Sequence, residues 1–249
     1  MPPSAAIEVD KLTKIYNGSA APALNSISLR IEKGFFFGLL GPNGAGKTTA
    51  VSILCGLMKP TAGAVSVFGL SFTKNKTEIK KLMGVVPQDI ALYDSLTAGE
   101  NLEYFGTLYG LRGDVLKLRI TESLSIFGLE QSRNKMIKYF SGGMKRRINL
   151  AAGILNRPEI LFLDEPTAGI DVQSRTVIAE YLKEINRQGT TVIYTSHMME
   201  EAESLCSHIA VLDNGKIIAD GTPAGLISRH QCSGLENLFL KLTGRKMRD

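Results

Sequence analysis

The sequence of 249 residues has no tryptophan, few cysteines and no long apolar run. Its three cysteines, Cys55, Cys206 and Cys232, lack the spacing of metal ligands, and this odd, sparse set predicts reduced thiols in a cytosolic protein. An apolar run such as "FFFGLL" has six residues, whereas a membrane-spanning helix needs about 20. We therefore expect a chain that does not cross a membrane by itself.

The first residues also lack the pattern of a secretory signal, because "MPPSAAIEVDK" has no charged region followed by an apolar core. The content of 44% hydrophobic and 21% charged residues is typical of a globular protein. The net charge of +5 suits an anionic ligand, a membrane surface or nucleic acid, and does not choose among them. A surface of solvated lysines explains it equally well.

Short apolar stretches alternate with amphipathic stretches along most of the chain. "FFFGLLG" and "EILFLDEP" are apolar until their last residues, which is typical of strands buried on both faces of a sheet. "AIEVDKLTKIY" and "ALNSISLRIEKG" alternate apolar and polar residues, as half-buried strands do. Helical spacing follows several strands, so we predict an α/β fold with a mostly parallel sheet.

One long stretch departs from this alternation. Between Asp89 and Leu155 three segments have helical spacing, and no convincing strand separates them. We interpret residues 89–155 as a helical lobe inserted into a domain that spans residues 1–232. Residues 233–249 are predicted to form a C-terminal helix and a basic tail.

The segment "GPNGAGKTT" lies between a predicted buried strand and a predicted helix. It fits the pattern G-x-x-x-x-G-K-[ST], in which backbone N–H groups and the helix N-terminus surround phosphate oxygens. Lys47 supplies a positive charge for the outer phosphates, and the Thr48 hydroxyl is a suitable ligand for Mg²⁺. A chance glycine turn is the alternative, but its position between strand and helix argues against it. The predicted nucleotide-binding residues are Gly41, Pro42, Asn43, Gly44, Ala45, Gly46, Lys47, Thr48 and Thr49.

Polar residues also follow the other buried strands. Asp164 and Glu165 end "ILFLDE", where one carboxylate can hold Mg²⁺ and the other can deprotonate an attacking water. His197 ends the strand "TVIYTSH" and is a candidate sensor of the γ-phosphate, and Gln88 follows "MGVVP" as a candidate contact to the metal or water. Each of the last two, taken alone, is more typical of a structural residue. Together with the phosphate loop and the acid pair, they favour a catalytic site.

The stretch "YFSGGMKRRINL" is a second candidate anion-binding segment. Ser141 and the N–H groups of Gly142 and Gly143 stand at the start of a basic, helix-compatible run, where a helix N-terminus attracts negative charge. A single nucleotide site does not require two such loops.

These motifs and their order, from residue 7 to about residue 230, resemble those of the ATPase subunits of ATP-binding cassette (ABC) transporters. "FSGGM" is similar to the family's signature loop, whose commonest form is "LSGGQ", with Phe140 and Met144 in place of Leu and Gln. Tyr16 stands where the family stacks an aromatic residue on adenine, and "AGID" at residues 168–171 stands where it contacts a partner. The resemblance implies a P-loop NTPase-type fold with an antiparallel N-terminal β subdomain.

The resemblance also implies a mechanism. The signature loop, Ser141 to Gly143, would close over ATP held by another subunit, in a head-to-tail homodimer or a heterodimer with a close relative. Mg²⁺ would be held by Thr48, Gln88 and Asp164, while Glu165 and His197 would serve catalysis. The "FSGGMKRR" form resembles single-domain subunits of exporters for drugs, lipids and polysaccharides. These subunits are cytoplasmic and peripheral on the inner face of the cell membrane, where the helical lobe would meet a separate permease.

Two other classes share the phosphate loop. A soluble cassette ATPase acting on DNA or the ribosome usually carries two cassettes or long coiled-coil insertions, and this chain has neither. No basic stripe with interleaved aromatic residues is present, so we expect no nucleic-acid partner. A kinase would have no use for "SGGM".

Overall fold

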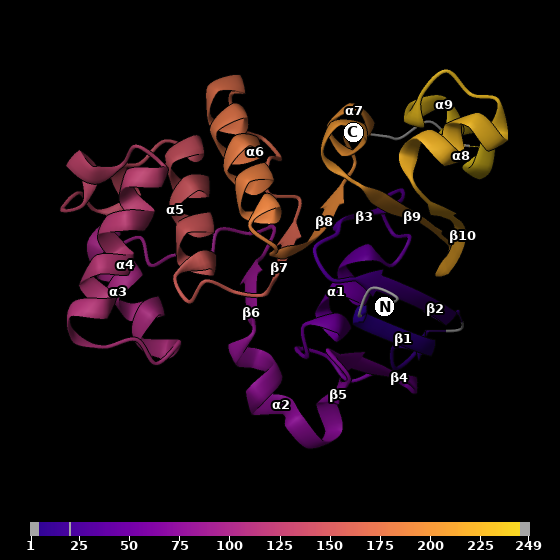
Figure 1. Ribbon diagram of the computed structural model, residues 1–249, viewed down its shortest axis with the longest axis horizontal. Helices are drawn as coiled ribbons and strands as arrows, with labels where there is room; N and C mark the ends of the chain where they lie inside the picture. The colour runs from indigo at the N-terminus through magenta and orange to yellow at the C-terminus, as the bar shows by residue number, and fades with distance from the viewer. Residues whose placement is uncertain (1–4, 20, 245–249) are drawn as a thin grey trace.

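The computed structural model describes residues 5–19 and 21–244, which form two sheets and the helices around them (Figure 1). The first sheet is antiparallel, with strand order β2-β1-β4-β5. This sheet confirms the antiparallel N-terminal β subdomain. Its strands are β1 (Ala5–Lys14), β2 (Leu24–Glu32), β4 (Ala62–Val67) and β5 (Leu70–Ser71).

The second sheet has the strand order β10-β9-β3-β8-β7-β6. All its neighbouring pairs are parallel except the β9–β10 hairpin, so the predicted mostly parallel sheet is confirmed. The hairpin turns at Asn214 and Gly215, which both have positive φ, as an Asn-Gly turn requires. The strands are β3 (Phe36–Leu40), β6 (Met83–Val86), β7 (Ile160–Asp164), β8 (Thr191–Ser196), β9 (His208–Asp213) and β10 (Lys216–Gly221).

Three helices, α3 (Ala98–Leu108), α4 (Gly113–Ile126) and α5 (Gly142–Ile154), form the predicted helical lobe at one side of the molecule (Figure 1). They lie between β6 and β7 in the chain, and α3 begins with a capping box of Thr97 and Glu100. Short 3₁₀ turns follow α4. The remaining helices are α1 (Lys47–Leu54), α2 (Phe72–Lys81), α6 (Val172–Arg187), α7 (Met199–Leu205), α8 (Pro223–His230) and α9 (Leu235–Thr243).

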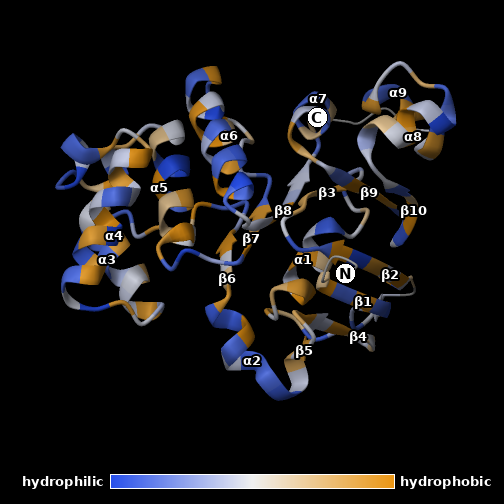
Figure 2. Ribbon diagram, viewed as in Figure 1, coloured by the Kyte–Doolittle hydropathy of each residue, from blue (hydrophilic) through white to orange (hydrophobic). Residues whose placement is uncertain are grey.

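Helix α2 and strand β5 were not predicted from the sequence. Only Ile79 of α2 is buried, and Figure 2 shows the helix as largely hydrophilic, so it has no apolar stripe of helical period. The predicted basic tail, residues 245–249, lies outside the described residues. Within the described ranges, no helix is long and apolar enough to span a membrane.

The central strands β3, β7 and β8 position the site. Their alternate residues enter two different cores, so that Phe36, Leu163 and Tyr194 pack on one face of the sheet and Phe37 and Phe162 on the other. Because these strands are parallel neighbours, their carboxyl ends meet at one edge. The phosphate loop follows β3. The acid pair lies at the end of β7, and His197 directly follows β8.

Candidate nucleotide-binding and hydrolysis site

The phosphate loop packs closely against the surrounding backbone. A Cβ atom on Gly41 would lie 2.3 Å from the Leu212 carbonyl oxygen, and one on Gly46, at a φ of 109°, would lie 2.4 Å from the Ala23 carbonyl oxygen. Lys47 is buried, and its Nζ donates hydrogen bonds to the carbonyl oxygens of Gly41 at 2.8 Å and Pro42 at 3.2 Å. The loop therefore curls around the ammonium group that would face the outer phosphates.

Two opposing effects act on the pKa of Lys47. Burial lowers the pKa of its ammonium group, and the nearby carboxylates of Glu165 and Asp164 partly offset this effect. An anionic phosphate group next to Lys47 would further favour its charged form.

A pocket of about 330 Å³ lies over the loop and brings together residues from separate parts of the chain. Most of its lining residues were predicted; Ala23 was not, because nothing in its local sequence marks it. The Tyr16 hydroxyl lies 3.1 Å from the Thr49 hydroxyl, Lys14 Nζ lies 5.5 Å from the centre of the Tyr16 ring, and Tyr16 is 42% exposed at the pocket. The lining residues are Tyr16, Ala23, Asn43, Gly44, Gly46, Lys47, Thr48, Thr49, Gln88 and Glu165.

The acid pair is separated by a sharp change of backbone direction. Asp164 ends β7, and Glu165 adopts a φ of 48°, in the left-handed region that a side chain rarely adopts. Thr195 on the neighbouring strand holds both residues, because its hydroxyl donates to Asp164 Oδ1 at 2.5 Å and accepts from the Glu165 N–H at 3.0 Å. The two carboxylates can therefore serve different tasks.

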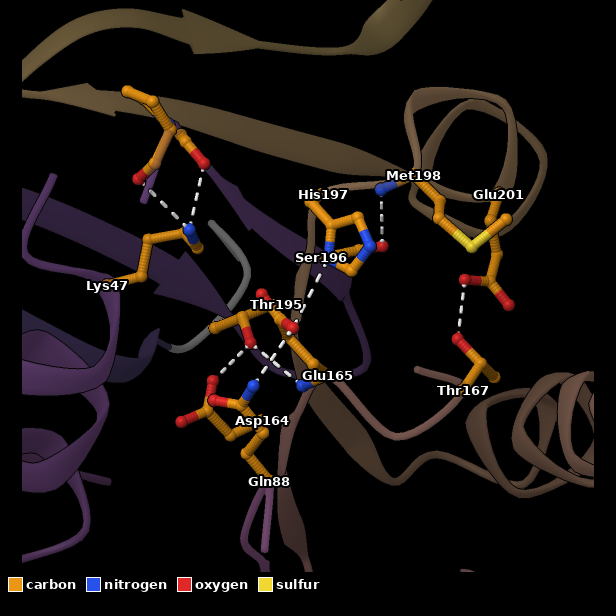
Figure 3. A network of polar contacts seen from close by, with 12 residues as sticks. Lys47, Gln88, Asp164, Glu165, Thr167, Thr195, Ser196, His197, Met198 and Glu201 are labelled. Carbon is orange, nitrogen blue, oxygen red and sulfur yellow. Dashed lines mark hydrogen bonds and ion pairs between the residues drawn. The ribbon is translucent and has the colours of Figure 1, made fainter. Parts of the chain in front are cut away.

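Glu165 contacts the predicted catalytic residue His197 and the predicted metal or water contact Gln88 (Figure 3). His197 Nδ1 lies 3.2 Å from Glu165 Oε2, and the Gln88 amide nitrogen donates to the same oxygen at 3.3 Å. This orientation leaves the Gln88 amide oxygen available as an acceptor. The structure thus brings Gln88, Glu165 and His197 together, as the strand ends predict.

The residues beside the phosphate loop also fit Mg²⁺. Thr48, Gln88 and Asp164 offer hydroxyl, amide and carboxylate oxygens, which this cation prefers. Among the described residues, no group of three or more His, Cys, Asp or Glu side chains forms a metal cage. That composition fits a metal that takes its other ligands from phosphate and water.

The segment Ser141 to Gly143 is not part of this pocket. Ser141 caps α5 by accepting a hydrogen bond from the Met144 N–H at 3.2 Å, and Ser141 and Gly142 are exposed. Gly143 is buried against the start of α6, beside Asp171 and Ser174. The second candidate anion-binding segment therefore lies outside the pocket over the phosphate loop.

Sequence reasoning missed Arg146 as well as Thr195. Arg146 is buried on α5, and its guanidinium donates to the Gln88 carbonyl oxygen at 2.7 Å, which ties the helical lobe to the Gln88 loop. A basic side chain in a basic run carries no signal for such a contact. Thr195 carries a weak signal, since it lies near the end of a buried strand, two residues before His197.

These features define an α/β nucleotide hydrolase with a phosphate loop and an acid pair, and the comparisons identify its family. A family model described as "ABC transporter" matches residues 24–168. The linearmycin resistance ATP-binding protein LnrL of Bacillus subtilis is 46% identical over 223 residues, which are 90% of this chain and 71% of that protein. The daunorubicin/doxorubicin resistance ATP-binding protein DrrA of Streptomyces peucetius is 38% identical over 226 residues, covering 91% of this chain and 68% of that protein.

Solved structures indicate the same family. An ATP-binding subunit of an ABC transporter superposes with a TM-score of 0.87 at 27% identity, covering 95% of this chain and 99% of that chain. A dimeric post-hydrolysis state of an ATP-binding cassette, bound to ADP and Pi, superposes with a TM-score of 0.80 at 28% identity, covering 87% of this chain and 98% of that chain. The chain belongs to the ABC transporter family, as an ATP-binding subunit and an ATPase. The comparisons give no support to the DNA or ribosome alternative.

Proposed function

We propose that this subunit hydrolyses ATP as a head-to-tail dimer and thereby drives export through a separate membrane permease. The observation that supports this proposal most directly is that Ser141 and Gly142 lie exposed at the start of α5, outside the pocket of their own chain. A helix N-terminus that lies away from the pocket of its own chain suits a nucleotide bound to a second chain. The relatives named for drug resistance and the dimeric neighbour bound to ADP and Pi support this proposal.

Each residue then has a defined task. Tyr16 stacks on adenine, residues 41–49 hold the phosphates, and Ser141 of the partner subunit closes over the γ-phosphate. Thr48, Gln88 and Asp164 would hold Mg²⁺, which neutralises phosphate charge when bound.

Hydrolysis starts when Glu165 accepts a proton from a water molecule that attacks the γ-phosphorus, and ADP leaves. His197, held beside Glu165, steadies the carboxylate and the γ-phosphate. Loss of the γ-phosphate removes the contacts that favour the closed dimer, so the dimer opens.

The helical lobe offers a surface for the permease. A groove of about 660 Å³ lies between the end of α1, α2, β6 and the end of α3, and Leu57 and Leu108 at this groove are 70% and 67% exposed. Tyr93 and Tyr104, also exposed, pack edge to face on the same lobe. Exposed apolar and aromatic side chains of this kind mark protein contacts. We infer that a cytoplasmic segment of the permease docks here, which places the subunit at the inner face of the cell membrane.

A trapped dimer tests the nucleotide part of the proposal. Glu165→Gln keeps the size of the side chain but removes the proton acceptor, so we expect ATP binding, loss of turnover and a stable dimer in ATP and Mg²⁺ by size-exclusion chromatography. Adding Ser141→Arg should abolish that dimer while leaving ATP bound. Near-normal turnover of Glu165→Gln, or wild-type activity per chain that stays flat across a wide dilution series, would refute this mechanism.

Affinity capture of the trapped subunit from gently solubilised host membranes tests the permease. We expect a polytopic membrane protein in about equal amount, lost with Leu108→Asp. Leu118→Asp is the matched control, because Leu118 is 56% exposed on α4 and does not line the groove. Recovery of ribosomes or DNA-bound proteins instead would support the rival class.

A further inference from the structure

A buried polar cluster lies behind the catalytic residues, on the side away from the phosphate loop. It joins Thr167 in the turn after β7, Tyr194 on β8 and Glu201 on α7. Thr167 is 3% exposed and Tyr194 is fully buried. The Thr167 hydroxyl donates to Glu201 Oε2 at 2.8 Å, and the Tyr194 hydroxyl donates to the same oxygen (Figure 3 draws the Thr167 bond). The two hydroxyl oxygens lie 3.3 Å apart.

The cluster holds the same short segment that Thr195 holds from the other face. The turn after β7 is closed by a hydrogen bond from the Ala168 N–H to the Glu165 carbonyl oxygen, and Thr167 lies inside this turn. Because neighbouring residues of a strand point to opposite faces, Thr195 contacts Asp164 and Glu165 while Tyr194 contacts the region of Thr167. The end of β8 thus fixes the acid segment at two points.

Glu201 extends this connection to the segment that carries His197. It lies in the first turn of α7, four residues after His197, and the turn between β8 and α7 is held by a hydrogen bond from the Met198 N–H to the Ser196 hydroxyl at 2.9 Å. The cluster therefore ties the turn of Glu165 to the turn of His197. The side chains of these two residues meet at 3.2 Å on the nucleotide side.

A purely structural contact does not require the buried polar groups of this cluster, which lower the stability of the folded chain. Glu201 Oε1 is buried and has no hydrogen-bond partner among the described residues. Burying part of a carboxylate disfavours folding, and apolar side chains of similar size would pack on the same core without that cost. Burial and the nearby Glu201 raise the pKa of the Tyr194 hydroxyl, so it stays protonated and remains a donor.

We propose that Tyr194, Thr167 and Glu201 are positioning residues for ATP hydrolysis, which keep the Glu165 carboxylate paired with His197 during the reaction. This inference rests on the catalytic roles proposed above for Glu165 and His197. None of the three touches the pocket that lies over the phosphate loop, so they act through the backbone of the two turns.

Hydroxyl deletion tests the inference with little change of shape. Thr167→Val and Tyr194→Phe each remove one donor to Glu201, and we expect kcat to fall by about 10- to 100-fold, because small displacements of reacting groups have effects of this size. The Kd for ATP, measured by calorimetry with Mg²⁺ in a Glu165→Gln background, should change by less than about twofold. Thr167→Ser keeps the hydroxyl and should restore kcat.

Glu200→Gln is the matched control, because Glu200 is exposed on the same turn of α7 and should retain wild-type kcat. Wild-type kcat in Tyr194→Phe, an equal loss in Thr167→Ser and Thr167→Val, or a parallel weakening of ATP binding would overturn the inference. Tyr194→Phe carries the test if Thr167→Val does not fold. Normal turnover by Glu165→Gln would refute the proposed catalytic role of Glu165. If Glu165→Gln is inactive but the cluster variants are fully active, only the positioning role is refuted.

Discussion

Gly142 and Gly143 form a matched pair for substitution, because they are adjacent at the start of α5 and have different surroundings. A Cβ atom on Gly143 would lie 2.4 Å from Ser174 Oγ and 2.6 Å from Asp171 Oδ2. A Cβ atom on Gly142 would meet no heavy atom within 4 Å. Alanine at these two positions should therefore have different effects on stability.

The expected magnitude follows from what must move. Asp171 caps α6 by accepting a hydrogen bond from the Ser174 N–H at 2.8 Å, so a methyl group on Gly143 displaces the cap itself. Loss of a cap and overpacking each cost on the order of 1–2 kcal/mol, and we expect Gly143→Ala to lower the free energy of unfolding by about 2 kcal/mol. Gly142→Ala should leave it unchanged or raise it by less than about 1 kcal/mol, since alanine favours helix.

Urea denaturation of the nucleotide-free chain, followed by circular dichroism, measures both values. Equal stability of the two variants would refute the packing argument. The ATPase rate adds a second comparison, because in the proposed dimer a methyl group on Gly142 would face the nucleotide of the partner subunit. We expect Gly142→Ala to lose activity at full stability, and a fully active Gly142→Ala variant would contradict the role proposed for this segment.

Three further outcomes are expected. Tyr16→Ala should weaken ATP binding by about 1–2 kcal/mol through lost stacking while Tyr16→Phe does not, and equal calorimetric affinities would exclude stacking. Arg146→Met removes the donor to the Gln88 carbonyl oxygen and should lower kcat by about tenfold, whereas Arg147→Met, whose donor contacts Phe127 within the lobe, should not. Burial raises the pKa of the Cys55 thiol to about 11, so at pH 8 iodoacetamide should label Cys55 only after denaturation. Mass spectrometry measures this labelling, and rapid labelling of the native chain would contradict the burial of Cys55.

Local sequence was sufficient for most of the fold. The buried strands β3 and β7 are apolar until their ends, and the phosphate loop follows β3 directly, so strand, loop and helix are encoded within one short segment. Helix α2 was not predicted because few of its side chains are buried, so its polar sequence shows no helical period of apolar residues. The helical lobe was visible because the spacing of apolar residues in α3, α4 and α5 is itself local.

The sequence by itself determined which residues carry the proposed chemistry: Lys47 and Thr48 for phosphate and metal, Asp164 and Glu165 as an acid pair, and Ser141 at the start of a second candidate anion-binding helix. Only the tertiary structure decided which of these residues meet. Gln88, Glu165 and His197 come together because parallel strands far apart in the chain end at one edge of a sheet. Ser141 is kept away from them because α5 belongs to the lobe. Thr195, Arg146 and Thr167 are ordinary polar residues in the sequence, and they contact residues more than 25 positions away, which no local spacing records.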